Sequence, residues 1–258
     1  MANGIADDML STMCLAATCP IIVAPAMNTK MFRNRIVKNN LQKLRDYGMT
    51  IIEPAVGRLA CADVGEGKLP DEQTLLSYIY RQIRHDKDLT GKKVVVTAGP
   101  TVEKIDPVRY ITNHSTGKMG YAIAANAMER GAKVTLISGP VNIDPPMFVD
   151  VINITSAKEM YDAVMENLQD CDILIKAAAV ADYTPVSVSD EKMKKKDGDL
   201  SIKLMRTKDI LKDAGSKKKD TQVVCGFSME TCNMLENSKK KLLSKNCDMI
   251  VANNLKDE

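Results

Sequence analysis

Val94-Val-Val-Thr-Ala-Gly-Pro100 is an apolar run that ends in a turn signal, which is typical of a buried strand opening a domain. The chain after it alternates between strand-like and helix-like stretches. The expected strands are 133–137, 149–154, 173–177, 223–227 and 249–252, and the expected helices are 117–130, 157–169, 207–215 and 231–246. This alternation predicts an α/β fold with a Rossmann-like, doubly wound parallel sheet.

Upstream of this region the same alternation occurs on a smaller scale. The expected strands are 20–24 and 49–52, the expected helices are 35–47 and 71–85, and a charged, glycine-rich loop is expected over 53–70. The polar segment 85–93 interrupts the pattern and is interpreted as a linker. The sequence therefore predicts two domains, residues 1–88 and 89–258.

Composition excludes several classes of function. The chain has 258 residues, 45% of them hydrophobic and 27% charged, with a net charge of +3, which is the balance of a globular protein. The absence of Trp and the presence of only three Phe disfavour a nucleic-acid platform that stacks bases. Seven Cys without a CxxC pair indicate neither a disulfide framework nor a zinc site. No apolar run approaches the length of a membrane span and no signal peptide is recognisable, so a cytoplasmic protein is expected.

Two motifs are candidates for ligand binding. Thr116-Gly-Lys-Met-Gly120 opens a helix, so it is either a seat for phosphate or a tight structural turn. Ile175-Lys-Ala-Ala-Ala-Val-Ala-Asp182 places small residues where open α/β sheets bind ligands. Asp182 is either an acceptor for a sugar or a base amine, or a turn residue. The residues alone leave these alternatives open.

Six segments together resemble a known family. Asp106-Pro-Val-Arg-Tyr-Ile-Thr-Asn-His-Ser-Thr-Gly-Lys-Met-Gly120 resembles the ligase half of the bacterial bifunctional phosphopantothenoylcysteine decarboxylase/phosphopantothenate–cysteine ligase. So do Ala178–Tyr183, Glu191–Lys195 and Gly226–Thr231, whereas Pro25–Phe32 and Leu59–Leu69 resemble the end of the decarboxylase half. The segments follow the family's order. The resemblance implies the C-terminal part of a flavodoxin-like decarboxylase domain followed by a ligase domain, and we expect truncation at the N-terminus and also at the C-terminus.

For the ligase half, the resemblance implies coenzyme A biosynthesis by CTP-dependent activation of 4'-phosphopantothenate. An acyl-cytidylate forms with Mg²⁺ present, and the amine of L-cysteine then attacks it. Asn113 matches the residue that holds this intermediate, and Lys192 matches the residue that converts it. The expected nucleotide-binding residues are Lys176, Ala177, Ala178, Asp182, Lys192, Lys208, Asp209, Ile210, Leu211, Phe227, Lys241 and Lys245. Lys208 stands where the family often has Pro. No metal ligand is identified.

For the decarboxylase half, the resemblance implies FMN as cofactor, Asn28 as a substrate-binding residue and Cys61 as a catalytic residue. Outside this family Cys61 would be interpreted as an inert thiol. The only His residues are His85 and His114, so the family's active-site His has no match in the first part. We therefore expect that this chain alone does not decarboxylate. The family's ligase dimer and decarboxylase trimer predict a homo-oligomer.

Two other functions compete with this prediction. A nicotinamide-dependent oxidoreductase requires GxGxxG after the first strand and an acidic residue about 20 positions later. The segment Val94–Pro100 has no such glycine pattern. A non-catalytic assembly subunit is the second alternative, and only an assay with CTP, phosphopantothenate and cysteine separates it from a ligase.

Overall fold

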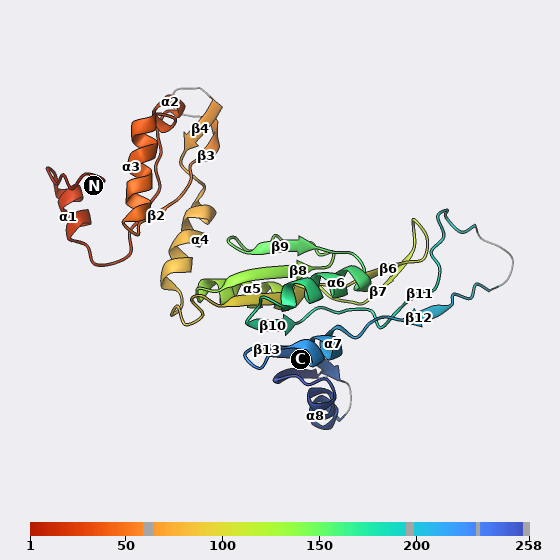
Figure 1. Cartoon of the computed structure of the whole chain (residues 1–258). Helices are drawn as coiled ribbons and strands as arrows, with labels where there is room; N and C mark the ends of the chain where they lie inside the picture. The colour runs from red at the N-terminus through yellow and green to blue at the C-terminus, as the bar shows by residue number, and fades with distance from the viewer. Residues whose placement is uncertain (59–63, 195–198, 231–232, 255–258) are drawn as a thin grey trace. The chain divides into compact units, whose positions relative to one another are not determined.

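The computed structural model describes residues 1–58, 64–194, 199–230 and 233–254. The chain forms two compact units, Met1–His85 and Asp86–Glu258, which are drawn in Figure 1. The division falls three residues before the boundary that the sequence suggests. Each unit is described separately below.

The first unit combines short helices with two pairs of strands. Its elements are α1 (Met9–Ala16), β1 (Ile22–Val23), α2 (Thr29–Phe32), α3 (Arg35–Asp46), β2 (Thr50–Ile51), β3 (Ala55–Arg58), β4 (Val64–Lys68) and α4 (Glu72–Ile83). Strands β1 and β2 are parallel, and β3 and β4 are antiparallel. A small core forms where Leu41 and Leu44 of α3 pack with Phe32 of α2 and Ile51 of β2.

The prediction of a loop over 53–70 is wrong, because β3 and β4 form an antiparallel ribbon within it. Glycines hid the strand pattern in the sequence, yet the structure requires one of them. Gly67 has φ +125°, and a Cβ there would lie 2.0 Å from the carbonyl oxygen of Met27. The Met27 N–H donates to the Gly67 carbonyl over 2.9 Å, so the ribbon docks closely on the segment before α2.

The second unit contains a six-stranded sheet. Its elements are β5 (Lys93–Ala98), β6 (Val102–Lys104), β7 (Tyr110–Thr112), α5 (Lys118–Glu129), β8 (Lys133–Ser138), β9 (Asp150–Asn153), α6 (Ala157–Leu168), β10 (Ile173–Lys176), β11 (Tyr183–Pro185), β12 (Leu204–Arg206), α7 (Ile210–Lys217), β13 (Val223–Glu230), α8 (Met234–Ser244) and β14 (Met249–Asn254). The sheet order is β14-β13-β10-β5-β8-β9, and all five pairings are parallel. The predicted parallel α/β sheet is confirmed.

Alternating side chains of β5 explain why helices cover both faces of this sheet. Val94 and Val96 belong to a core with α5, whereas Val95 belongs to the opposite core with α6 and α7. Successive side chains of a strand point to opposite faces, so an uninterrupted apolar run such as Val94–Val96 is buried on both. The sheet is therefore doubly wound around β5, its central strand.

Two antiparallel ribbons that the sequence did not predict extend beyond the carboxyl ends of the sheet strands (Figure 1). One consists of β6 and β7, and the other of β11 and β12. The helix expected from residue 207 begins at Ile210, because the Asp209 side chain accepts the N–H of Lys212 and caps it. Thr207, which lies before the helix, instead donates its hydroxyl to the Ala181 carbonyl.

Candidate functional site

A loop of small residues after β10 forms one wall of the candidate site. Two fully buried threonines hold it from the neighbouring strand β5 and the turn that follows β5. The Thr97 hydroxyl accepts the Ala178 N–H over 3.1 Å, and the Thr101 hydroxyl accepts the Ala181 N–H over 3.0 Å. Because buried hydrogen bonds fix both ends of this loop, it presents a rigid backbone surface at the carboxyl edge of the sheet.

Asn113 contacts the same loop from the other side. It follows β7 directly, and its side-chain amide donates to the Ala179 carbonyl over 3.3 Å. The nearby turns are built from glycines: Gly99 has φ +74° and Gly117 has φ +75°, and a Cβ on Gly117 would lie 3.3 Å from the Gly99 nitrogen. Only glycine permits this approach, so the motif beginning at Thr116 is a tight turn that packs against the β5 turn.

A cavity of about 390 Å³ lies beside this loop. It is lined by Lys176, Val180, Asp182, Tyr183, Arg206, Thr207, Lys208, Asp209, Ile210, Lys241 and Lys245. Seven of these are among the residues that the sequence predicts for nucleotide binding. They come from the end of β10, the start of α7 and the end of α8, which adjacent strands of the sheet bring together.

Lysines at the end of α8 are held in place by defined contacts. Lys241 donates to the Phe227 carbonyl over 3.0 Å, and Lys245 forms a 3.0 Å ion pair with Asp209. Burial alone would raise the pKa of Asp209, but the Lys212 N–H and the Lys245 ammonium outweigh burial and lower it. Asp209 is thus a stable carboxylate that orients Lys245 while it caps α7.

Lys176 makes the cavity unusually receptive to an anion. Burial, together with the nearby ammonium groups of Lys241 and Lys245, lowers its pKa to about 8, and Asp209 and Asp182 only partly oppose this. The cavity therefore gathers more positive charge than its own carboxylates balance. An anionic ligand such as a phosphate chain would supply the missing negative charge.

Five of the residues expected to bind the nucleotide do not line this cavity. Ala178 and Leu211 are buried behind it, at 8% and 1% exposure. The Phe227 carbonyl accepts a hydrogen bond from Lys241, which does line the cavity. Ala177 is half-buried and lies between β10 and the loop that follows it. Lys192 is exposed on the segment between β11 and β12.

The two residues expected in the decarboxylase half are both in the first unit. The Asn28 side chain accepts the Lys30 N–H over 2.9 Å and so caps α2. Cys61 lies outside the described residues.

Several residues of the site had no strong sequence signal. Thr97 and Thr101 looked like ordinary strand and turn residues, and only the structure shows their hydroxyls holding the loop. Arg206 lines the cavity and bonds the Tyr183 side chain, which raises the pKa of its guanidinium. In the sequence, only the position of Arg206 close to Lys208 indicates that it could belong to a basic site.

We expect Leu211→Ala to act on stability rather than on nucleotide affinity. Leu211 packs in the core shared with α6, and it lies against Gly226, where an added Cβ would come within 2.5 Å of its side chain. The change should lower the free energy of unfolding by about 2–5 kcal/mol, as is usual for such cavities. Leu243→Ala, at a position that is 81% exposed, is the control and should stay within about 0.5 kcal/mol of wild type. Urea denaturation measures both, and a stable Leu211→Ala variant would contradict the burial argument.

A parallel sheet with a cationic cavity at its carboxyl edge is the architecture of a nucleotide-binding α/β domain. The chain belongs to the DNA/pantothenate metabolism flavoprotein family, whose C-terminal domain matches residues 89–258. Residues 1–84 match the Flavoprotein family.

Named relatives agree with this membership. The coenzyme A biosynthesis bifunctional protein CoaBC of Bacillus subtilis is 49% identical over 259 residues, which are 99% of this chain and 64% of that protein. A cysteine/cysteine sulfinic acid decarboxylase from an unknown prokaryotic organism is 44% identical and covers 100% of this chain and 73% of its own length. The crystal structure of the C-terminal domain of a CoaBC protein shares 49% identity at a TM-score of 0.58, over 64% of this chain and 79% of that one. The chain thus spans less than two thirds of the Bacillus relative.

The described residues contain neither a membrane-spanning helix nor a cluster of metal-ligating side chains. None of the helices in that part of the chain is long and apolar enough to cross a membrane. Within the same residues, no group of three or more His, Cys, Asp or Glu side chains is placed to hold a metal ion.

Proposed function

We propose that residues 89–258 catalyse the CTP-dependent ligation of 4'-phosphopantothenate with L-cysteine. The observation that carries the proposal is the cluster of Lys176, Lys241 and Lys245 on one cavity beside the loop after β10. Family membership supports it, since the Bacillus relative is named for coenzyme A biosynthesis. A nicotinamide-dependent oxidoreductase has no support from the sequence motifs or from these relatives.

The chemistry explains why such a cavity is needed. A substrate carboxylate must approach the α-phosphate of a triphosphate, and the two anions repel each other. Three preplaced ammonium groups offset this repulsion and stabilise the charge that develops as pyrophosphate leaves. We propose that the triphosphate binds among these lysines, and that Asp182 accepts hydrogen bonds from the sugar or base of the nucleotide.

Asn113 and Lys192 then act on the acyl-cytidylate. Asn113 contacts the carbonyl of Ala179, and the loop that contains Ala179 runs on to Asp182 on the cavity wall. An intermediate lying along this loop would bring its acyl end within reach of the Asn113 amide, which adds donor and acceptor capacity without adding charge. We assign Lys192 to the second step, in which the cysteine amine attacks the acyl carbon and CMP leaves.

Other parts of the prediction rest on the resemblance alone. These are the Mg²⁺ requirement, the substrate-binding role of Asn28, the catalytic role of Cys61 and assembly into a homo-oligomer. FMN as cofactor has further support, because residues 1–84 match the Flavoprotein family. When bound, FMN would supply the oxidation of the substrate thiol in a decarboxylase reaction.

Incubation of the purified chain with CTP, Mg²⁺, 4'-phosphopantothenate and L-cysteine tests the proposal. We expect pyrophosphate, CMP and phosphopantothenoylcysteine in equal amounts, detected by mass spectrometry and a coupled pyrophosphate assay. ATP in place of CTP is the comparison for nucleotide choice, and cysteine sulfinic acid without nucleotide tests the activity in the name of the second relative. Failure to release pyrophosphate with either nucleotide would refute a ligase, and the absence of any product from cysteine sulfinic acid as well would favour a non-catalytic subunit.

A further inference from the structure

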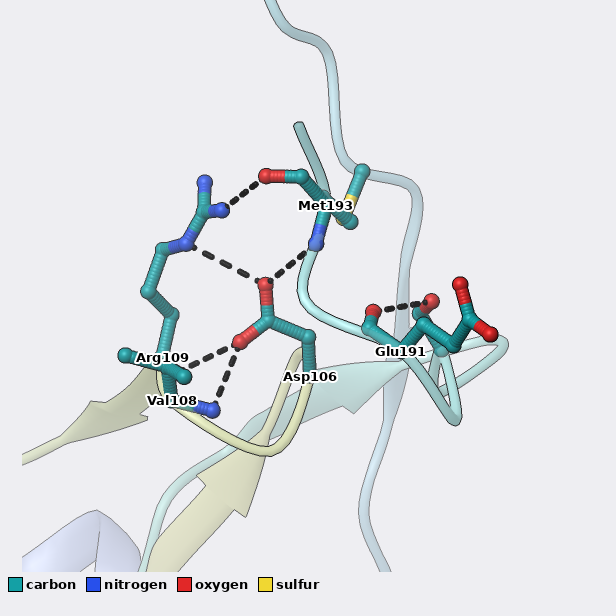
Figure 2. Close-up of polar contacts among 6 residues, drawn as sticks. Asp106, Val108, Arg109, Glu191 and Met193 are labelled. Carbon is teal, nitrogen blue, oxygen red and sulfur yellow. Dashed lines mark hydrogen bonds and ion pairs between the residues drawn. The ribbon is translucent and has the colours of Figure 1, made fainter. Parts of the chain in front are cut away.

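A buried carboxylate connects the turn of the β6–β7 ribbon to a distant segment of the chain. Asp106 is 1% exposed. One of its oxygens accepts the N–H groups of Val108 and Arg109 over 2.8 and 2.7 Å. The other accepts the Met193 N–H over 3.1 Å and lies 3.1 Å from Nε of Arg109. Figure 2 shows the carboxylate between these donors.

Further contacts fix the same segment on both sides of Lys192. The Arg109 guanidinium donates to the Met193 carbonyl, directly after Lys192 (Figure 2). The Ser189 N–H donates to the Ile105 carbonyl over 3.0 Å, a few residues before it. Lys192 itself is exposed. The backbone on either side of this lysine is therefore tied to the turn that contains Asp106, while the side chain is left to reach a ligand.

A structural turn alone would not need all of these contacts. One carboxylate oxygen bonding the N–H groups of the next residues is sufficient to hold a turn. The second oxygen instead reaches Met193, which is far away in the sequence. Burial of the carboxyl would raise its pKa, but the three N–H donors and the Arg109 guanidinium outweigh burial and lower it. Asp106 is therefore a charged acceptor, and one of its oxygens loses the Met193 N–H if the segment around Met193 moves.

We propose that Asp106 is a positioning residue that holds Lys192 for conversion of the acyl-nucleotide intermediate. The inference rests on the proposed function. It adds that the rate of amide formation depends on a carboxylate that does not touch the substrate. Positioning by neighbouring groups is worth much in catalysis, because small displacements of a reacting group cost large factors in rate.

Asp106→Asn tests this directly. The amide oxygen can still accept the two N–H groups of the turn. The amide nitrogen would then face the Met193 N–H and the Arg109 guanidinium, and it cannot accept a hydrogen bond from either because it is itself a donor. The turn is kept, and the hydrogen bond from the Met193 N–H to residue 106 is lost. Amide exchange of the peptide around 187–194 should accelerate about tenfold or more, as expected for losing a hydrogen bond to a charged group. In single-turnover experiments, pyrophosphate release should stay within about twofold of wild type, whereas amide formation slows about tenfold or more.

Comparison variants separate positioning from general destabilisation. Lys192→Gln should also accumulate the acyl-nucleotide, and the double variant should be no slower than Lys192→Gln alone. Asp88→Asn removes an exposed partner of Arg130 near the amino end of β5 and should change neither step. Equal slowing of both steps by Asp106→Asn, or unchanged amide formation, would overturn the inference. A wild-type chain that never ligates would instead refute the proposed function, and unchanged exchange around Met193 would still refute the tether.

Discussion

Lys176→Met is expected to lower the affinity for CTP about 10²-fold, because contacts between close charges are worth roughly 2–5 kcal/mol each. The same change should leave the thermal midpoint of the unliganded protein unchanged or raise it. Lys176 is partly buried and lies near two other ammonium groups, so its charge disfavours the folded state until an anion arrives. Methionine keeps most of the length of the side chain without this penalty. Loss of binding together with retained stability is the pattern of a functional site.

Protonation gives this prediction a second readout. The pKa of Lys176 is about 8, below its ordinary value of 10.5, so the side chain loses its charge as pH rises through 8. Its penalty on folding is therefore present at neutral pH and is relieved between about 8 and 10.5. A bound triphosphate favours the charged form and raises the pKa of Lys176. CTP binding near pH 8 should consequently take up protons, and affinity should fall as pH rises above 8.

Isothermal titration calorimetry in buffers of different ionisation enthalpy measures both quantities. The control is Lys240→Met, which removes a lysine that is 72% exposed and pairs only at the surface with Glu236 one helical turn earlier. It should bind CTP as wild type does. Normal affinity in Lys176→Met, or proton uptake that persists in that variant, would remove Lys176 from the proposed triphosphate site.

Asn113→Asp is expected to lower kcat for ligation about 10²–10³-fold, the range seen when a preplaced donor to a developing charge is lost. The carboxylate would lie beside an anionic intermediate. It would also face the Ala179 carbonyl without a proton to donate, in place of the 3.3 Å hydrogen bond that the amide makes. Both effects act on the loop after β10, so turnover should fall more than CTP affinity does.

Asn167→Asp is a matched control for this substitution. The Asn167 amide likewise donates to a backbone carbonyl, that of Ala163 over 2.9 Å, but it lies at the end of α6, away from the cavity. Steady-state assays of both variants at saturating CTP give the comparison. Near-normal kcat in Asn113→Asp would exclude Asn113 from contact with the intermediate, whatever the control shows.

The arrangement of the sheet could be predicted because its signal is local. Val94–Val96 is apolar without interruption, and a glycine turn ends the strand, so the sequence alone indicates a strand buried on both faces. The lysines of α8 are similar, since residues four apart share one helix face, and Lys241 and Lys245 both line the cavity.

Features that depend on distant contacts could not be predicted. Thr97 and Thr101 acquire their roles only when β10 lies beside β5 and brings Ala178 and Ala181 to their hydroxyls. The two ribbons beyond the sheet were missed because short strands around turns carry too few residues for a clear alternation. The link between Asp106 and Met193 joins these ribbons, and no periodicity in either segment indicates it.

The order of the strands has a consequence for synthesis of the protein. The cavity needs Lys176 from the end of β10, Asp209 at the start of α7 and the lysines of α8, whereas β5, β8 and β9 contain none of its lining residues. A nascent chain can therefore bury most of the core between the sheet and α5, which β5, α5 and β8 supply, before any nucleotide has a place to bind. CTP would then stabilise the completed domain by mass action and give little protection to the intermediates that precede docking of α8.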